Sequence, residues 1–329
     1  MDDFRVSVAL CTRNGAAFIA RQVQSILRQS RPVDEIVVSD DASADDTVAI
    51  IERMVAEHGA DHPVVPVLIV LRNSSALGVT RNFERAIDSC SGDLIALCDQ
   101  DDVWHHAKIE RLIAQFEERP STLMIGTDAR LVDGRGSPFG DGLLATIGVT
   151  ESERDSIHAG RGFSTLLRRN VITGATAMIR GGLARRARPF PASWVHDEWL
   201  AIVAAASEDG LDLLEEQLLD YRQHGSNEIG ATSLTFRGRL HRLRTPRTER
   251  NLRLLRRAEA LAVRITDFTS IAADVEAARQ KQEHEAVRGS LPASRARRIR
   301  PVLREWRTGR YSRYGLGAQD VLRDLVQPV

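Results

Sequence analysis

Acidic side chains crowd into the stretch "CDQDDVW" (98–104), directly after "DLIALC" (93–98), which has the composition of a buried strand. Residues two apart in extended backbone share a face, so Asp99 and Asp101 should project together. Their oxygens suit a hard divalent cation, Mg²⁺ or Mn²⁺, most naturally one shared with a diphosphate. The Asp-x-Asp pattern is short enough to arise by chance. Asp102 is expected only to start the next helix, where the helix dipole favours negative charge.

A second acidic pair lies in "SDDAS" (39–43), again after an apolar run. A carboxylate here can accept hydrogen bonds from a ribose hydroxyl or a base N–H. The alternative is an Asx-type turn that caps a helix beginning near Asp45. Both interpretations stay open for Asp40, and Asp41 is expected to bind ligand.

A third polar stretch, "TRNG" (12–15), follows the first apolar run. Backbone N–H groups at a helix N-terminus can hold polar or anionic groups. The side chain of Asn14 is expected to be the N-cap of the following helix, whatever else it contacts.

Two stretches of the second half also carry candidate chemistry. In "WVHDEW" (194–199), a carboxylate beside aromatic surface can have a raised pKa and act as a general base. An N-cap at Asp197 explains this stretch equally well. In "YRQHGSN" (221–227), Arg222 and His224 can neutralise charge on a leaving diphosphate, although a solvated loop is the simpler interpretation.

The elements that must position these residues alternate along the first 133 residues. Apolar runs predict strands at 6–11, 35–40, 66–72, 93–98 and 122–133. Helical spacing predicts helices at 16–29, 44–59, 79–90 and 106–120. Such alternation predicts an α/β fold with a mostly parallel, Rossmann-like sheet covered by helices. Ligands bind beyond the carboxyl ends of such strands, so the three polar loops should meet at one rim.

The later chain has a different pattern. A mobile glycine-rich loop is predicted at 134–148, and 211–225 is expected to run from a strand or mixed segment into a polar loop. The other predicted elements are a short helix, a strand-like segment and an amphipathic helix, at 163–170, 173–179 and 196–210. The main body is expected to end near residue 234, before a helix-forming, arginine-rich extension at 235–329.

Composition restricts the class of protein. A chain of 329 residues with 43% hydrophobic and 27% charged residues has the profile of a soluble globular protein. The apolar runs are too short for a membrane span, and the acidic N-terminus does not resemble a signal peptide. Three cysteines are too few for a disulfide framework. Cys11 and Cys98 are expected to fill the core in a reducing compartment, which predicts a cytoplasmic protein.

The net charge of zero conceals a split. Residues 235–329 hold 22 Lys and Arg and 10 Asp and Glu, a charge of +12, and the body therefore carries −12. This split indicates either that the extension meets an anionic surface or that it packs on the body. Contact with the inner face of the plasma membrane or with a partner protein is one hypothesis. Nucleic acid is not expected, because the extension has few aromatic residues.

Taken in order, the motifs resemble those of family 2 inverting glycosyltransferases, which have a GT-A fold. The resemblance covers about residues 4–230 and rests on "VSVALCTRNGAAFIARQVQSILRQ", "DEIVVSDDASADDT", "LGVTRNFERAI", "GDLIALCDQDDVW" and "HDEW". Several segments are further similar to a rhamnosyltransferase-like bacterial branch: "NFERAI", "CDQDDVWHHAKIE", "ITGATAMI", "HDEWLAIVAAASEDG" and "YRQHGSN".

The resemblance implies a role for each matched residue. It implies that Asp101 binds the metal, and that Asp197 is the catalytic base with Glu198 as the alternative. Asp41 would contact the pyrimidine base, and Asp99 the ribose or sugar. The other implied nucleotide-sugar-binding residues are Thr12, Asn14, Asn82 and His224. The implied organisation is a glycosyltransferase domain at 1–234, with a nucleotide-sugar half at 1–133 and an acceptor half at 134–234. Within the acceptor half, the 134–148 loop and "TGATAMI" would border the acceptor side of the site.

The resemblance therefore implies a metal-dependent transferase. It would move a sugar, with rhamnose as the first choice, from a nucleoside-diphosphate sugar to a cell-surface polysaccharide or lipid-linked glycan precursor. One alternative is a nucleotidyltransferase, but "CTRNGAAF" lacks the glycine-rich phosphate loop and lysine expected of one. The other alternative is a binding protein with the same fold and no catalysis.

Overall fold

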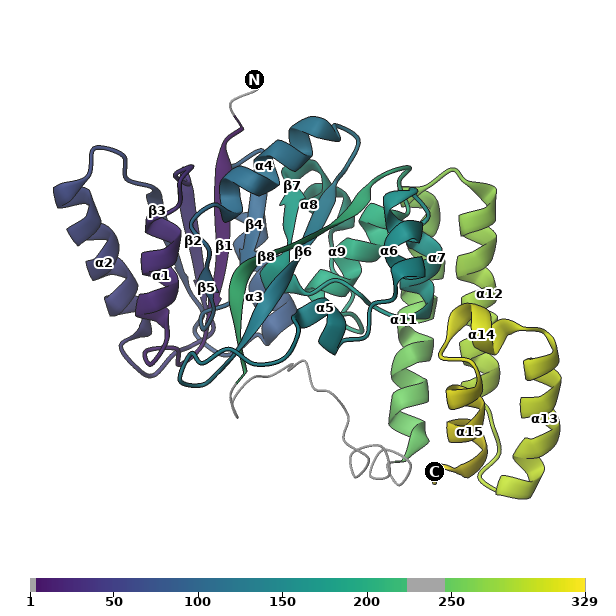
Figure 1. The fold of residues 1–329 in the computed structure, drawn as a ribbon. Helices are drawn as coiled ribbons and strands as arrows, with labels where there is room; N and C mark the ends of the chain where they lie inside the picture. The colour runs from purple at the N-terminus through teal and green to yellow at the C-terminus, as the bar shows by residue number, and fades with distance from the viewer. Residues whose placement is uncertain (1–3, 224–245, 329) are drawn as a thin grey trace.

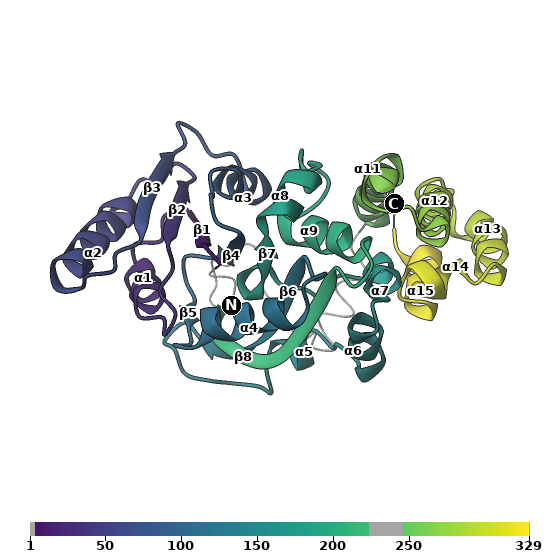
Figure 2. The same ribbon diagram turned by 90° about the horizontal axis from the view of Figure 1, so that it is seen from above.

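The structure, a computed structural model, describes residues 4–223 and 246–328. An eight-stranded sheet with the order β3-β2-β1-β4-β7-β6-β8-β5 forms its centre (Figures 1 and 2). The strands are β1 (Val6–Thr12), β2 (Glu35–Asp40), β3 (Val67–Arg72), β4 (Leu94–Cys98), β5 (Val103–Trp104), β6 (Met124–Asp133), β7 (Met178–Arg180) and β8 (Leu211–Gln223). The parallel pairing of β3, β2, β1 and β4 confirms the predicted first half.

Helices cover both faces of the sheet (Figure 2). The helices of the body are α1 (Ile19–Leu27), α2 (Thr47–Asp61), α3 (Val79–Asp88), α4 (Lys108–Glu118), α5 (Leu143–Thr146), α6 (Glu151–His158), α7 (Gly162–Arg168), α8 (Gly181–Ala187) and α9 (His196–Ala205). Alternate residues of β1 face two hydrophobic clusters, as the two-residue period of a strand requires. Ala9 and Cys11 pack on the side of α3 and α9, and Val8 and Leu10 on the side of α1, α2 and α4. The expected burial of Cys11 and Cys98 is confirmed.

The second half of the sheet is mixed. β7 pairs antiparallel with both β4 and β6, and β8 pairs parallel with β6 and antiparallel with β5. Segment 173–179 becomes a 3₁₀ turn (Gly174–Thr176) followed by β7, and 211–223 is one long strand. The prediction of an irregular mobile loop at 134–148 is wrong in part, because α5 lies there. Leu143 and Leu144 are buried, and Leu144 N donates to Asp128 Oδ1 at 2.9 Å.

The basic extension is helical, as predicted. Its helices are α11 (Arg247–Phe268), α12 (Ala272–Gly289), α13 (Arg295–Arg307), α14 (Arg310–Tyr314) and α15 (Ala318–Val326). Leu261, Ile265 and Phe268 share a hydrophobic cluster with Trp199 of α9, so the extension packs on the body. The predicted boundary near residue 234 lies outside the described residues. Within the described ranges, none of the helices combines the length and apolar character needed to cross a membrane.

Candidate active site

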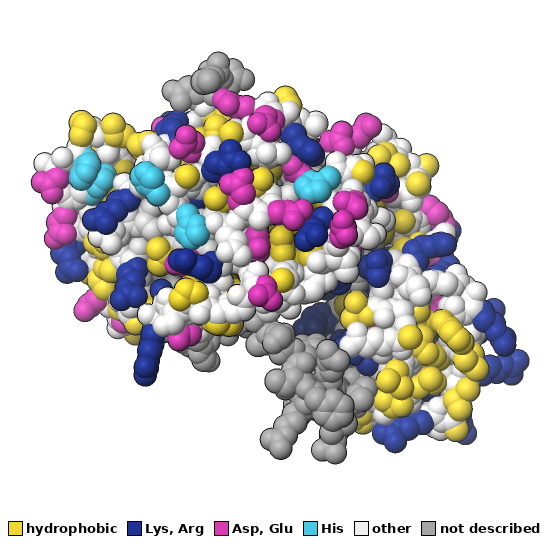
Figure 3. Space-filling view, viewed as in Figure 1, with side chains coloured by type: hydrophobic (Ala, Val, Ile, Leu, Met, Phe, Trp, Pro, Cys, Tyr) yellow, Lys and Arg dark blue, Asp and Glu magenta, His cyan; other side chains and the backbone are white. Residues whose placement is uncertain are grey.

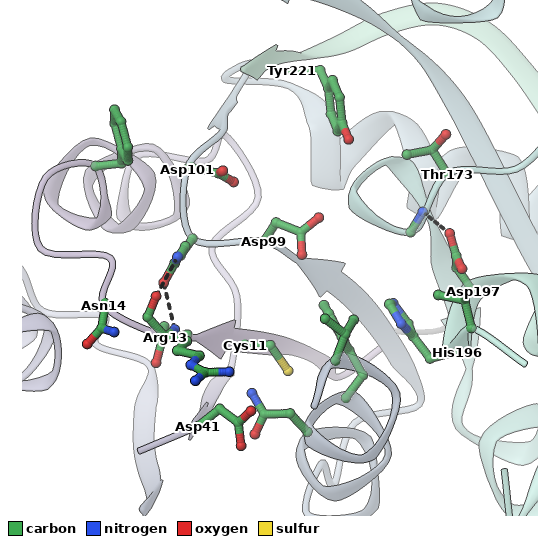
Figure 4. Close-up of a pocket in the computed structure, with 18 residues that line it drawn as sticks. Cys11, Arg13, Asn14, Asp41, Asp99, Asp101, Thr173, His196, Asp197 and Tyr221 are labelled. Carbon is green, nitrogen blue, oxygen red and sulfur yellow. Dashed lines mark hydrogen bonds between the residues drawn. The ribbon is translucent and has the colours of Figure 1, made fainter. Parts of the chain in front are cut away.

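A pocket opens at the carboxyl ends of β1, β2 and β4 and holds a cavity of about 390 Å³ (Figure 4). The three polar loops predicted to share a rim all contribute to it, through Thr12 and Asn14, through Asp41, and through Asp99 and Asp101. The opposite wall comes from the second half of the chain, and it includes Thr173, Gly174, His196, Asp197 and Tyr221. Residues 134–148, expected to border the acceptor side, do not line this pocket.

The loop that carries Asp99 and Asp101 is fixed to the end of β1 by Gln100. Gln100 Oε1 accepts from Arg13 N at 2.8 Å, and its Nε2 donates to Arg13 O at 3.0 Å (Figure 4). A Cβ atom at Gly15 would lie 2.2 Å from Gln100 Oε1, so this approach requires glycine. The side chain of Gln100 thus ties the loop of the two aspartates to the backbone of Arg13.

The prediction for Asp102 is wrong, because this residue does not start a helix. Asp102 precedes β5, is buried, and accepts a hydrogen bond from Arg222 N at 2.9 Å. Burial, followed by the nearby Asp101 and Asp99, raises its pKa well above the ordinary range. Asp102 therefore joins the acidic loop to β8.

A positive charge lies beneath the acidic loop, and sequence reasoning missed it. Lys108 begins α4, is fully buried, and donates from Nζ to Ala175 O at 2.9 Å. Burial lowers its pKa to about 8, against the opposing effect of Cys98, Asp102 and Asp99. Nothing in "HHAKIERL" separates this lysine from a solvated helix residue.

The loops after β1 and β2 are joined by side-chain hydrogen bonds. Thr12 Oγ1 donates to Asp40 Oδ1 at 2.8 Å, and Asp40 Oδ2 accepts from Ser43 N at 2.9 Å. Of the two roles considered for Asp40, ligand binding and an Asx-type turn, these hydrogen bonds favour the turn. The expected N-cap role of Asn14 is wrong, since α1 begins only at Ile19. Asn14 Oδ1 instead accepts from Ala44 N at 2.8 Å, with Asn14 at a φ of 49°.

Asp41 and Asn82 lie at the base of the pocket and are already well bonded. Asp41 accepts from Asn73 Nδ2 at 3.0 Å, Leu77 N at 2.6 Å and Gly78 N at 3.0 Å. Asn82 Oδ1 accepts from Ser39 Oγ at 2.7 Å and from Asn73, and Asn82 Nδ2 donates to Ser39 O at 2.8 Å. Their positions are thus set by the protein before any ligand binds.

Asp197 faces the pocket from the first turn of α9. Its Oδ2 accepts from Gly174 N at 2.9 Å (Figure 4), and its Oδ1 accepts from Glu198 N at 2.8 Å. Burial raises the pKa of Asp197, and these backbone N–H groups oppose the rise. A carboxylate whose pKa is raised is more basic than an exposed aspartate, which suits it to take up a proton.

Glu198, the alternative base, lies elsewhere. Its carboxylate pairs with Arg257 of α11, whose guanidinium lies over the Trp194 ring at 4.1 Å from the ring centre. Glu198 does not line the pocket. Burial raises its pKa, and Arg257 opposes this. The geometry therefore favours Asp197 over Glu198.

His196 is a pocket residue to which the sequence assigned no role. Its ring stacks on Phe83 with ring centres 3.7 Å apart, and neither ring nitrogen has a hydrogen-bond partner in the described part of the chain. Burial lowers the pKa of His196 to about 3, so the imidazole is neutral at physiological pH. Gly174 provides the space, because a Cβ there would lie 2.9 Å from His196 Nε2.

Only residues 221–223 of the "YRQHGSN" stretch are among the described residues. Arg222 is buried on β8 and donates from Nε to Asp101 O at 2.8 Å and from one terminal nitrogen to Asp133 O at 3.2 Å. The solvated-loop interpretation is therefore wrong for Arg222. His224 and Asn227 lie outside the described residues.

The carboxylates of the pocket suit a cation that is shared with the phosphates of a substrate. Mg²⁺ and related ions are often held by one or two carboxylates plus substrate phosphates, and Asp99 and Asp101 both line the pocket. Among the residues described, no group of three or more His, Cys, Asp or Glu is placed to hold an ion unaided. The residues present therefore fit a cation that binds together with a diphosphate.

This pocket occupies the position at which α/β proteins bind nucleotides, beyond the carboxyl ends of parallel strands. The family model "Glycosyl transferase family 2" matches residues 7–174, slightly more than half of the chain. The chain therefore belongs to glycosyl transferase family 2, and its mixed sheet with covering helices is the GT-A fold that was expected.

Two curated relatives illustrate the family. The chain is 31% identical over 114 residues to the putative teichuronic acid biosynthesis glycosyltransferase TuaG of Bacillus subtilis, covering 35% of this chain and 42% of that protein. It is 29% identical over 126 residues to the UDP-Glc:alpha-D-GlcNAc-diphosphoundecaprenol beta-1,3-glucosyltransferase WfgD of Escherichia coli, covering 38% of this chain and 46% of that protein. The match thus spans less than half the length of these relatives.

Two solved structures have a similar fold. TarS 1-349 of S. aureus in complex with UDP-GlcNAc aligns with a TM-score of 0.53 at 17% identity, covering 97% of this chain and 89% of that one. The mannosyltransferase PcManGT of Pyrobaculum calidifontis, in complex with GDP-Man and Mn²⁺, aligns with a TM-score of 0.51 at 18% identity, covering 98% and 86%. Identities this low establish likeness of fold alone.

Proposed function

We propose that this protein transfers a sugar from a nucleoside-diphosphate sugar to a hydroxyl group of a glycan or lipid-linked acceptor. The observation that carries the proposal is that Asp99, Asp101 and Asp197 line one pocket in a chain of this family. The two structural neighbours are complexes with UDP-GlcNAc and with GDP-Man and Mn²⁺. The names of the two relatives, with a teichuronic acid and a diphosphoundecaprenol, favour a cell-surface glycan or its lipid-linked precursor as acceptor.

The proposed roles follow the resemblance and the pocket. Asp101 binds the cation, and the donor is held by Thr12, Asn14, Asp41, Asn82, Asp99 and His224. An ionised carboxylate has about four acceptor positions, so Asp41 keeps capacity for a base N–H beyond its three hydrogen bonds. The "HDEWLAIVAAASEDG" and "YRQHGSN" stretches support rhamnose as the donor sugar through their resemblance to the rhamnosyltransferase-like branch.

The proposed reaction is a single displacement. Asp197 accepts the proton of the acceptor hydroxyl, whose oxygen forms a bond to the anomeric carbon. The bond from that carbon to the diphosphate oxygen breaks with its electron pair on the oxygen. The nucleoside diphosphate leaves, and the anomeric configuration inverts. A bound Mg²⁺ or Mn²⁺ stabilises the negative charge of the leaving group.

The test is release of nucleoside diphosphate from a panel of nucleotide sugars, with an acceptor glycan and with either cation. The donor is chosen first by thermal stabilisation, because a ligand that binds the native state raises the melting temperature. Asp197→Asn is expected to reduce kcat by about 10²- to 10⁴-fold, the usual contribution of a general base. Asp101→Asn is expected to weaken donor binding in the presence of the cation.

Two control variants keep this test specific. Glu198→Gln should retain most of the turnover, because Glu198 pairs with Arg257 away from the pocket. Asp61→Asn changes an exposed carboxylate at the end of α2 and should match the unmodified protein. Full turnover by Asp197→Asn, or loss of turnover only in Glu198→Gln, would show that the base is wrongly assigned.

A further inference from the structure

Helix α13 of the extension has one side that packs inward and another that faces solvent. Arg298, Val302 and Glu305 are buried. Ile299 is 50% exposed and Trp306 is 53% exposed. Large apolar side chains standing singly on a surface are ordinary, so their neighbours decide whether these two have a function.

The apolar side chains of α13 form one stripe. Ala296, Ile299, Leu303 and Trp306 are spaced by three and four residues, so they lie on one side of the helix. On the neighbouring α15, Leu322 and Val326 are 49% and 36% exposed. Figure 3 shows hydrophobic side chains gathered over this part of the extension, with basic side chains at the margin.

A row of arginines runs beside the apolar stripe. Arg297, Arg300, Arg304 and Arg307 are exposed, and none of them forms an ion pair with any residue that the structure describes. The acidic residue of the helix, Glu305, is buried and accepts from His284 at 2.8 Å. A shallow groove joins the two rows, lined by Ala296, Ile299, Arg300, Leu303, Arg304 and Arg307.

We propose that this surface, the α13 face (Ala296, Arg297, Ile299, Arg300, Leu303, Arg304, Trp306 and Arg307, with Leu322 and Val326), docks on anionic lipid bilayers. An interfacial helix places its apolar stripe at the boundary of the acyl chains and its basic residues among anionic headgroups. Tryptophan is favoured at that depth because its ring is apolar and its N–H is polar.

Charge and composition favour a bilayer over other occupants. A second copy of the chain would bring two arginine rows together, and like charges repel. A nucleic acid would match the charge, but Trp306 is the aromatic residue of this face, and single-stranded sites stack successive bases on several aromatic rings. A bilayer offers phosphate-bearing headgroups to the arginine row and an apolar layer to the apolar stripe.

The position of the face agrees with this occupant. The chain enters β1 from the N-terminus at the top of Figure 1, so the carboxyl ends of the parallel strands, and the pocket, lie toward the bottom. Helices α13 and α15 extend beyond the sheet toward the same end of the molecule (Figure 1). The inference goes beyond the proposed transfer reaction and does not depend on it, because lipid binding is measured without turnover.

The experiment is co-sedimentation of the full chain with vesicles. Vesicles of equal parts phosphatidylcholine and phosphatidylglycerol are expected to retain the protein at low salt, and vesicles of phosphatidylcholine alone are not. Each arginine near an anionic surface contributes about fivefold to binding, so Arg300→Gln/Arg304→Gln/Arg307→Gln should weaken it about 100-fold. Donor binding and melting temperature should stay unchanged, since these side chains are exposed and outside the pocket.

Trp306 supplies a second readout. Trp104, Trp194 and Trp199 are buried, so a blue shift of the emission on adding the anionic vesicles should come from Trp306 and disappear in Trp306→Phe. The matched control is Arg28→Gln/Arg53→Gln/Arg72→Gln, which removes the same charge from exposed positions on the body.

Four results would overturn the proposal: equal binding to both kinds of vesicle, unchanged binding by the α13 triple variant, an equal loss in the control triple variant, or unchanged Trp306 emission. Binding of a DNA oligonucleotide without vesicle binding would assign the face to nucleic acid instead. A dimer that is lost in the α13 triple variant, again without vesicle binding, would assign it to a second copy of the chain.

Discussion

His196 brings a neutral imidazole to the wall of a polar pocket, and within residues 4–223 and 246–328 its nitrogens have no hydrogen-bond partner. A buried polar group without a partner costs free energy, so its presence in a native protein calls for an explanation. His196 lies beside Asp197, the proposed base, and because both of its nitrogens are buried, we expect a substrate hydroxyl to reach one of them only after a small displacement of the pocket wall. The stack on Phe83 fixes the plane of the ring and therefore the direction of those nitrogens.

Replacement of His196 by phenylalanine separates structure from function. His196→Phe keeps the stack on Phe83 and removes both unpaired nitrogens, so the melting temperature should stay level or rise. Loss of one neutral hydrogen bond to substrate should lower kcat/KM about tenfold. Thermal unfolding and steady-state kinetics on the same sample check this. A lower melting temperature with unchanged kcat/KM would make His196 a core residue only.

The pH dependence of turnover should report Asp197. The base acts as a carboxylate, and burial raises its pKa, so kcat/KM should fall with decreasing pH at a higher pH than for an exposed aspartate. His196, with its pKa lowered to about 3, should not contribute a step near pH 6.5. A pH profile of the unmodified protein and of His196→Gln checks this. A step near pH 6.5 that vanishes in His196→Gln would contradict it.

The spacing of strands located three of the pocket aspartates, whereas Asp197 was found through the "HDEW" motif. Asp41, Asp99 and Asp101 were found because the ends of parallel strands share an edge. Lys108 and His196 were not found. The sequence does not distinguish a buried lysine from an exposed one, or a histidine that only packs in the core from one that lines a pocket. The role of Asp102 was predicted wrongly because its hydrogen-bond partner, Arg222 N, lies 120 residues away in the sequence.

At the level of elements, the contact between Gly15, after β1, and Gln100, after β4, can be tested by substitution. Gly15→Ala places a Cβ 2.2 Å from Gln100 Oε1, so the Gln100 side chain must move and the two hydrogen bonds that tie its loop to Arg13 are disturbed. Overpacking of this kind costs about 1–3 kcal/mol, and donor binding should weaken with it. Calorimetric titration with the donor and cation, together with thermal unfolding, checks both effects.

Two further variants show whether the effect of Gly15→Ala is steric. Gly289→Ala, at the end of α12, meets Leu255 at an ordinary 3.5 Å and should leave donor binding unchanged. Gly15→Ala/Gln100→Ala removes the clashing atoms and should recover part of the binding. Donor affinity in Gly15→Ala equal to that of the unmodified protein would show that the contact does not position the aspartates.

Element types were predictable where the pattern was regular, and strand direction was not. The alternation of strands and helices predicted the four parallel strands β1 to β4, but the strand predicted at 122–133 became β6 of the mixed half. The antiparallel direction of β7 depends on its fit between β4 and β6, which a three-residue strand does not encode. Helix α5 was missed because glycines dominate its segment, while burial of Leu143 and Leu144 decides its conformation.

Across the whole molecule, the extension is held together by buried charges as well as apolar contacts. Arg288 of α12 donates from Nε to Asp324 Oδ2 at 2.7 Å and lies 3.1 Å from Glu285 Oε2. All three side chains are almost fully buried. Burial alone would raise the pKa of Glu285, but Lys281 and Arg288 outweigh it and lower that pKa. Part of the arginine bias is therefore structural.

Removing Arg288 should destabilise the extension strongly. Arg288→Met removes one cation from Glu285 and Asp324, which keep Lys281 and Arg250 as partners, so the loss of charged hydrogen bonds should cost about 1.5–3 kcal/mol. Arg279→Met on the same helix removes an exposed partner of Glu276 and Glu283 and should cost about 1 kcal/mol or less. Thermal and urea unfolding of both variants check this. Equal melting temperatures would show that the buried network adds nothing to stability.

The buried ammonium of Lys108 joins the two walls of the pocket. It is hydrogen-bonded to the carbonyl of Ala175, which follows the pocket residues Thr173 and Gly174, and its charge acts on Asp99 and Asp102 of the donor side. In the proposed reaction, an acceptor that displaced the 173–175 backbone would also move this charge relative to Asp99 and Asp102. We therefore expect acceptor binding to alter the affinity for the donor.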